Sequence, residues 1–154
     1  MKKTEILLFA GIVALDLLTK TYIETHMTIG QSIAVIDGFF YITFVTNTGA
    51  AWSILSGNMD FLTLVSLAGM LILGYLYLKT DPGQRLERYA WVVLLAGTAG
   101  NFYDRLRFHY VRDFLDFYPL GYDFPVFNIA DSALTIGVGL LLLTIFFERK
   151  KMHG

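Results

Sequence analysis

Four long apolar segments constrain this 154-residue chain more than any other feature. They lie at about 5–23, 59–78, 88–105 and 127–147, and each is close to the ~20 residues that a helix needs to cross a bilayer. The second is the cleanest, because Phe61 to Leu78 contains no charge. Charged residues make up 16% of the chain, against about 25% in soluble domains, so we predict an integral membrane protein.

The first apolar segment has two interpretations. Met1-Lys2-Lys3 before an apolar run is also how a cleavable signal peptide begins. The run continues through Asp16 and Lys20, however, and no A-x-A-like cleavage site follows it. We therefore interpret this segment as a retained first span.

Lysine and arginine near the ends of the spans indicate their direction, since these residues favour the cytoplasmic side. They gather at the N-terminus, between the second and third spans, and at the C-terminus: Lys2, Lys3, Lys79, Arg85, Arg88, Arg149, Lys150 and Lys151. Residues 24–58 contain none, whereas 106–126 contain Arg107 and Arg112. We expect both termini in the cytoplasm and these two longer connections outside.

The first outer connection has the composition of a small β-hairpin. Residues 33–45 are rich in β-branched and aromatic residues, with Asp37-Gly38 as a turn signal. Both faces would be apolar, so the hairpin either packs on lipid or substrate or merely closes the bundle. A short surface helix at about 49–56 would complete an extracytoplasmic cap at about 31–57. The predicted fold is an all-α membrane protein, a single four-transmembrane-helix bundle with this small hairpin or sheet.

Acidic residues place a polar layer at the outer ends of the predicted spans. Asp16, Asp60, Asp104 and Asp131 fall at this depth, whereas the inner halves of the spans are almost purely apolar. A charge within a bilayer costs at least about 2.5 kcal/mol, so such residues usually face a protein interior or a wet cavity. The layer therefore predicts binding or chemistry at the outer interface.

Two groups in this layer look supportive rather than reactive. Asp16 and Lys20 are four residues apart on one helix face, so we expect a structural ion pair that can reach another helix. Asn101, Asp104 and Arg105 lie together at the end of the third span, and we interpret them as an interhelical polar network.

Reacting groups are expected among the remaining acids. Asp131 lies about one turn inside the fourth span, beside Asn128, and no basic residue of that span is near enough to neutralise it. The positive end of the helix dipole favours its anion. Its partner must come from elsewhere, and the loop acids Asp113 and Asp116 both follow the third span closely. Spacing alone does not choose between them.

Five sequence blocks together resemble the bacterial lipoprotein signal peptidases, a family of membrane aspartyl endopeptidases. The blocks are DLLTK from Asp16, NTGAAWS from Asn47, GNFYDR from Gly100, VRDF from Val111 and FNIADSALTIG from Phe127. They extend from the first predicted span to the last in the expected order and spacing. One departure is Thr46, because some members carry Arg before the Asn of the NxGAA block.

The resemblance implies removal of the signal peptide from a prolipoprotein whose cysteine carries diacylglycerol, with cleavage just before that cysteine. It places the catalytic pair on Asp113 and Asp131. Supporting or substrate-binding positions map onto Asp16, Lys20, Asn47, Gly49, Asn101, Asp104, Arg105 and Asn128. The expected location is the bacterial cytoplasmic membrane with the active site at the outer face. The expected partners are lipid-modified prolipoproteins and membrane lipid, without nucleic acid, for a monomeric enzyme.

Two close carboxyl groups can hydrolyse a peptide without a metal or an organic cofactor. If they share one proton, the ionised member activates water and the protonated member polarises the scissile carbonyl. The residues do not indicate which acid has which role. The chain has no cysteine, and His26, His109 and His153 show no HExxH-like spacing, so we predict no metal site.

Two other functions fit a membrane protein with buried acids. An ion or proton transporter would need ionisable groups through the full thickness of the membrane, and the inner halves of the predicted spans lack them. A structural or partner-binding membrane protein is the second alternative, and it does not require the five blocks. Cleavage of a lipid-modified prolipoprotein would separate all three.

Overall fold

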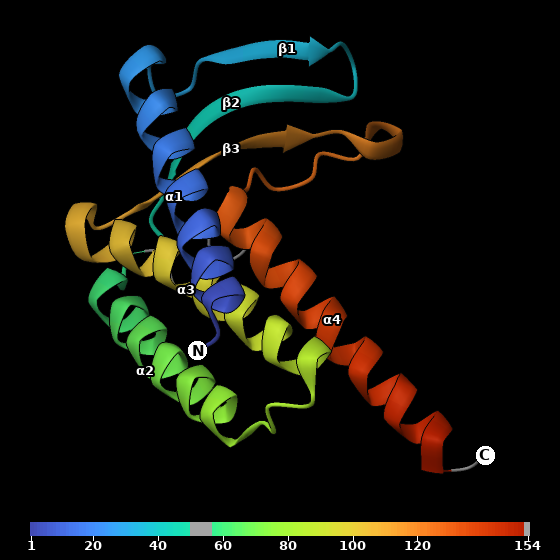
Figure 1. The fold of residues 1–154 in the computed structure, drawn as a ribbon. Helices are drawn as coiled ribbons and strands as arrows, with labels where there is room; N and C mark the ends of the chain where they lie inside the picture. The colour runs from blue at the N-terminus through green and yellow to red at the C-terminus, as the bar shows by residue number, and fades with distance from the viewer. Residues whose placement is uncertain (50–56, 153–154) are drawn as a thin grey trace.

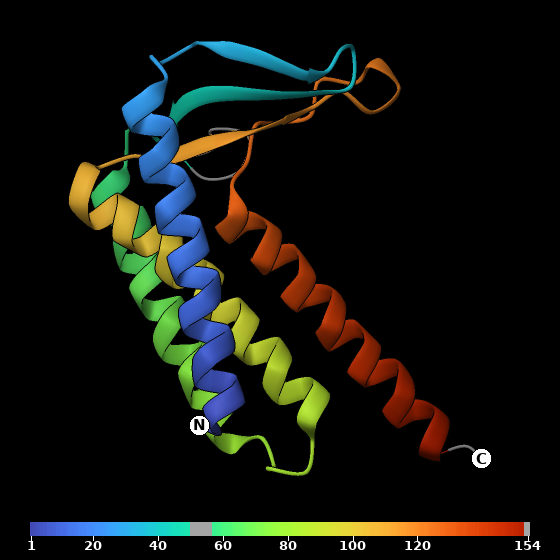
Figure 2. The same cartoon turned by 45° about the horizontal axis from the view of Figure 1, so that its top comes forward.

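Four helices and a three-stranded antiparallel sheet make up the computed structural model, which describes residues 1–49 and 57–152 (Figure 1). The helices are α1 (Lys3–His26), α2 (Met59–Lys79), α3 (Arg85–Phe108) and α4 (Ile129–Met152). The strands are β1 (Ser32–Ile36), β2 (Phe40–Asn47) and β3 (Val111–Phe117). The sheet covers one end of the helices, and the N-terminus and the end of α4 both lie away from it (Figures 1 and 2).

The central helix is α3, which packs against α1, α2 and α4. Of the helices in the described residues, α1, α2 and α4 are long and apolar enough to cross a membrane. These three expose large apolar side chains such as Leu18, Leu71 and Phe146, as lipid-facing helices do. The predicted third segment also forms a helix, but it carries more charge than the other three. Two of these charges, Arg88 and Asp104, are buried against the neighbouring elements.

Small residues let α3 and α4 approach closely, as expected from Gly97 and Gly100. A Cβ atom added to Gly97 would lie 2.5 Å from the carbonyl oxygen of Ala130, and one added to Gly100 would meet the Asp16 carboxylate. Only glycine fits at such contacts. The polar end of α3 is therefore held directly against the first turn of α4.

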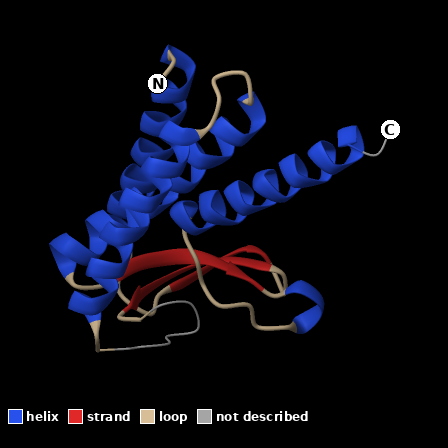
Figure 3. Cartoon of the chain, turned by 90° about the horizontal axis from the view of Figure 1, so that it is seen from below, coloured by secondary structure: helices blue, strands red, loops and turns tan. Residues whose placement is uncertain are grey.

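The predicted hairpin is present, and a third strand joins it. β1 pairs with β2, and Gly38 in their turn adopts a φ of 70°. β3, which we expected to be a loop, pairs antiparallel with β2 so that Asp113 lies opposite Val45. The long helices extend away from the sheet, and a short 3-10 helix, Pro119–Gly121, lies at one end of the strands (Figure 3). The predicted surface helix at about 49–56 lies outside the described residues, except for Gly49.

At the end of the helices remote from the sheet, a buried polar cluster joins three helices. The Glu5 carboxylate of α1 accepts hydrogen bonds from Arg88 Nε of α3 at 2.9 Å and from the Tyr77 hydroxyl of α2 at 2.7 Å. Arg88 also contacts the Tyr77 hydroxyl. The expectation of almost purely apolar inner halves is therefore wrong here. The acid is tolerated because it is paired with a cation and hydrogen-bonded.

Candidate active site

A cavity of about 830 Å³ lies between the sheet and the ends of α3 and α4. Its lining is mainly apolar and includes Val45, Val111 and Leu134. Polar side chains enter it from four elements: Asn47 of β2, Asn101 and Arg105 of α3, Asp113 of β3, and Asp131 of α4. An apolar cavity with a few convergent polar groups is the usual form of a ligand-binding site.

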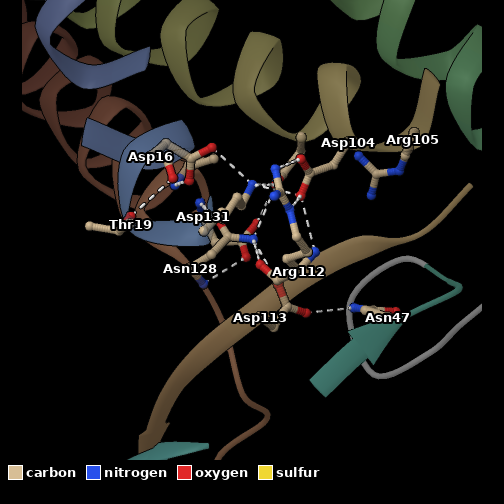
Figure 4. Close-up of polar contacts among 12 residues, drawn as sticks. Asp16, Thr19, Asn47, Asp104, Arg105, Arg112, Asp113, Asn128 and Asp131 are labelled. Carbon is tan, nitrogen blue, oxygen red and sulfur yellow. Dashed lines mark hydrogen bonds and ion pairs between the residues drawn. The ribbon is translucent and has the colours of Figure 1, made fainter. Parts of the chain in front are cut away.

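Asp113 and Asp131, here called the acid pair, both line this cavity and are held by one asparagine. The Asn128 side-chain amide donates to Asp113 Oδ1 at 2.7 Å, and the Asn128 backbone N–H donates to Asp131 Oδ2 at 3.2 Å (Figure 4). One acid comes from a strand and the other from the first turn of a helix. The fold thus brings the two predicted catalytic acids to the same space.

Neutral amides occupy every oxygen of the acid pair. The other two donors are Asn47 Nδ2, 3.1 Å from Asp113 Oδ2, and Asn101 Nδ2, 2.7 Å from Asp131 Oδ1. No ion pair within 4.0 Å joins either acid to a lysine or arginine of the described residues. Neither acid is therefore fixed as an anion by a direct cationic partner.

A second contact fixes the direction in which each of these amides points. The side-chain oxygens of Asn47, Asn101 and Asn128 accept hydrogen bonds from Gly49 N at 2.9 Å, Lys20 Nζ at 3.0 Å and Asp131 N at 2.9 Å, respectively. An amide whose oxygen is engaged in this way must direct its NH2 group to the other side. The expected supporting residues Asn47, Gly49, Asn101 and Asn128 therefore orient donors toward the acid pair.

Asn128 also precedes α4 and caps its first turn. Its side-chain oxygen accepts from the Asp131 N–H while the Asp131 carboxylate accepts from the Asn128 N–H, a reciprocal capping arrangement. Asn and Asp are among the preferred residues at such helix starts. The same two residues therefore begin the helix and form part of the site.

Behind the asparagines, Lys20 is the centre of a fully buried ion-pair network. Its Nζ lies 2.8 Å from Asp16 Oδ2 and 3.4 Å from Asp104 Oδ2. The other Asp16 oxygen accepts from the backbone N–H of Ala130 at 2.9 Å. The expected Asp16–Lys20 ion pair is therefore confirmed, and it reaches both α3 and the start of α4.

Arg105 lies at the cavity of the acid pair, whereas Asp60 and Asp116 lie away from it. Arg105 lines the cavity, and its buried Nε has no hydrogen-bond partner among the described residues. Asp60 is 95% exposed and lies 3.9 Å from His109, so it does not join the other acids. Asp116 accepts from the Thr43 hydroxyl at 2.5 Å and does not line the cavity. The alternation of side chains along β3 thus separates Asp113 from Asp116.

Burial raises the pKa of Asp113 from 3.8 to about 7, and the negative charge of Asp131 adds to the rise. Hydrogen bonds from Asn47 and Asn128 and the charge of Lys20 act in the opposite direction. Because desolvation is the larger effect, Asp113 retains a proton up to neutral pH. A buried acid with such a pKa in a cavity is typical of a functional site.

Arg112, predicted from the sequence only as a flanking charge, is buried behind the site. Its side chain is 2% exposed and pairs with Glu24 of α1 and Asp104 of α3, each at 2.7 Å. The feature of the sequence that could have indicated its role is its position directly before Asp113, a candidate catalytic acid. Among the described residues, no group of three or more His, Cys, Asp and Glu side chains is arranged to hold a metal ion.

Together, the apolar helices and the acid pair define a helical membrane protein with a two-carboxylate site. The family of signal peptidase (SPase) II matches residues 8–147. The chain therefore belongs to the signal peptidase II family and is a protease that acts on lipoprotein signal peptides. The resemblance drawn from the five sequence blocks is confirmed.

Relatives agree over nearly the whole length of the chain. The lipoprotein signal peptidase of Staphylococcus carnosus is 45% identical over 141 residues, which are 92% of this chain and 89% of that protein. The lipoprotein signal peptidase of Listeria monocytogenes serotype 4a is 42% identical over 148 residues, 96% of each chain. A bacterial membrane enzyme solved by the in meso method at 2.3 Å resolution superposes with a TM-score of 0.93 at 41% identity, covering 98% of this chain and 92% of its own.

Proposed function

We propose that this protease cleaves prolipoproteins just before a cysteine that already carries diacylglycerol, with Asp113 and Asp131 as its catalytic residues. The observation that carries the proposal is the acid pair on one cavity, each oxygen with a neutral donor. Two carboxyl groups that share one proton can supply both a general base and a general acid. No metal or organic cofactor is required for this chemistry.

In the proposed reaction, a water molecule lies between the acid pair and the scissile carbonyl. The ionised acid takes a proton from the water as its oxygen bonds to the carbonyl carbon, and the protonated acid donates to the carbonyl oxygen. The C–N bond then breaks as the acid that took the water proton gives it to the leaving nitrogen, and the other acid takes back a proton from a hydroxyl of the tetrahedral intermediate as the C=O bond re-forms. The raised pKa of Asp113 supports Asp113 as the protonated member and Asp131 as the base. Arg105 lies on the same cavity and can donate to substrate carbonyl groups.

We further propose four membrane spans, with α3 as the inner one and the sheet on the outer side of the membrane. The position of the N-terminus and the end of α4, both away from the sheet, supports this topology (Figure 2). The lysines and arginines at these ends favour the cytoplasmic side. The acid pair would then lie near the outer interface, where the acyl chains of a lipid-modified cysteine meet the headgroups. β1, whose residues are all exposed, is available to lipid or substrate.

A cleavage assay tests the proposed function directly. The purified protein, as a monomer in lipid or detergent, should cleave a diacylglyceryl-modified prolipoprotein and leave its unmodified precursor intact. Sequencing of the product should find the modified cysteine at the new N-terminus. EDTA should leave the rate unchanged. Equal cleavage of the unmodified precursor contradicts the proposed requirement for diacylglycerol, and loss of cleavage with EDTA contradicts a metal-free acid pair.

Activity should fall as the pH rises through about 7, because Asp113 is the proposed proton donor. Its pKa in the folded protein is raised, so the proton is present below about pH 7 and is lost above it. Above that point Asp113 has lost its proton, and kcat/KM should fall by about tenfold per pH unit. Measuring kcat/KM across this range tests the assignment, because this ratio reports the pKa of the protein without substrate, and a flat profile up to about pH 9 contradicts it.

A further inference from the structure

Arg112 joins β3 to two helices through a guanidinium group whose three nitrogens each donate to a carboxylate. Its Nη2 and Nε bind the two oxygens of Asp104 at 2.7 and 3.2 Å, and its Nη1 binds Glu24 Oε2 at 2.7 Å. The ring of Phe108 lies 4.5 Å from the guanidinium carbon. Such a two-point contact with a carboxylate is specific to arginine and fixes the orientation of both groups.

Asp104 is shared between Arg112 and Lys20, and this sharing determines where Lys20 lies. The three donors of the Lys20 ammonium face Asp16 at 2.8 Å, Asn101 at 3.0 Å and Asp104 at 3.4 Å. Asp104 is the most distant of these partners, and Arg112 donates to both of its oxygens. Without the Arg112 charge, Asp104 would be a fully buried anion with Lys20 as its nearest cation. The lysine would then be drawn toward Asp104 and away from Asn101.

We propose that Arg112 is a positioning residue for the hydrolysis: by holding Asp104, it keeps Lys20 on Asn101 and the Asn101 amide aimed at Asp131. The inference rests on the proposed function, since it assigns the acid pair as the reacting groups. The chain of contacts from Arg112 to the site is Asp104, Lys20, Asn101 and Asp131. Every member before Asp131 is buried, so the charges along it are weakly screened.

The backbone of Arg112 provides a second route to the acid pair. Arg112 directly precedes Asp113 on β3, so the two side chains point to opposite faces of the strand. The Arg112 N–H also donates to Asp104 at 3.1 Å, and its carbonyl oxygen accepts from Asn128 Nδ2 at 3.5 Å. Anchoring Arg112 on one face therefore fixes the position from which Asp113 enters the cavity on the other.

Replacement of Arg112 should change kcat rather than KM. We expect Arg112→Gln to lower kcat by about 10- to 100-fold, the usual cost of losing a group that orients a reacting residue, with KM within about twofold. Arg112→Lys should recover part of the loss, because it restores the charge but not the two-point contact. Glu24→Gln is the matched control: it removes the other partner of Arg112 but leaves the contact with Asp104, so kcat should stay within about threefold.

The pH dependence of kcat distinguishes a positioning role of Arg112 from a purely structural one, because a purely structural role would not shift it. The charged groups around the acid pair are Asp16 and Lys20 of α1, Asp104 and Arg105 of α3, and Arg112 of β3. Loss of the Arg112 charge, with Lys20 drawn away from the acid pair, makes its surroundings more negative. The kcat profile of Arg112→Gln should therefore move to higher pH, and that of Glu24→Gln should not.

The outcomes separate this inference from the proposed function. An unchanged kcat and pH profile in Arg112→Gln overturns the positioning role, and so does an equal loss in Glu24→Gln. If Arg112→Gln does not fold, Arg112→Lys decides: full kcat with an unmoved profile overturns the inference, and a several-fold lower kcat with normal KM supports it. If Asp113→Asn cleaves as fast as the unaltered protein, the proposed function fails instead.

Discussion

Asp113→Asn and Asp131→Asn should each lower kcat on a lipid-modified prolipoprotein by about a thousandfold or more while leaving the fold intact. An amide has the shape of the carboxyl group but can neither take a proton from water nor return one to the leaving nitrogen. Because the two acids act as one unit, the double variant should be little worse than either single variant. Single-turnover rates with the protein in excess would measure the loss without interference from product release.

Asp116→Asn provides the matched control for these variants. Asp116 lies on the same strand, is also buried, and contacts Thr43 instead of lining the cavity. Its replacement should leave kcat within a few-fold of the unaltered protein. Full activity in Asp113→Asn or Asp131→Asn, or an equal loss in all three variants, contradicts the assignment of the acid pair.

The pH dependence of stability gives an independent check on the raised pKa of Asp113. Between the ordinary pKa of 3.8 and the raised value of about 7, the folded protein keeps a proton that the unfolded chain releases, so stability falls as the pH rises through this window. Above it, the buried anion costs up to about 4 kcal/mol. Asp113→Asn should therefore raise the unfolding temperature at pH 8 more than at pH 5, even though it removes activity.

Local patterns predicted the parts of the structure that depend on neighbours along the chain. Apolar length predicted the helices, Asp37-Gly38 predicted the hairpin turn, and the spacing of Asp16 and Lys20 predicted their ion pair. Each is a property of a short segment, set by helix periodicity or turn geometry. The acid pair was different: periodicity left Asp113 and Asp116 equivalent, and the family motif was needed to choose between them.

The third strand and the buried Glu5–Arg88 pair were not predicted, because both depend on contacts between different elements. β3 contains three charged residues among seven, a composition typical of a loop. It forms a buried strand because Arg112 pairs with Asp104 and Glu24, which lie on other elements. Tertiary contacts thus override local propensity there. The same holds for Glu5, whose partner Arg88 comes from another helix. The pairing of a buried charge can be predicted from local spacing only when its partner lies close by along the chain, as it does for Asp16 and Lys20.

Asn128 both caps α4 and donates a hydrogen bond to Asp113. Two replacements of Asn128 should separate the effect on stability from the effect on activity. Asn128→Ser retains an oxygen that can cap α4 but removes the NH2 group that donates to Asp113, whereas Asn128→Ala removes both. We expect both variants to lose about 100-fold or more in kcat, because Asp113 loses the donor that holds it in place. Only Asn128→Ala should also lose the ~1 kcal/mol of stability that a helix cap contributes.

Asn58 offers a control for the capping contribution, because it precedes α2 but makes no side-chain capping hydrogen bond. Asn58→Ala should therefore change neither the unfolding temperature nor kcat appreciably. If Asn128→Ser kept full activity while Asn128→Ala lost it, Asn128 would contribute to activity only by capping α4. The hydrogen bond from its NH2 group to Asp113 would then not be required for catalysis. If both lose activity but only one loses stability, the NH2 group acts on the acid directly. The requirement at this position is then for asparagine itself, since serine also caps helices but cannot supply the amide donor.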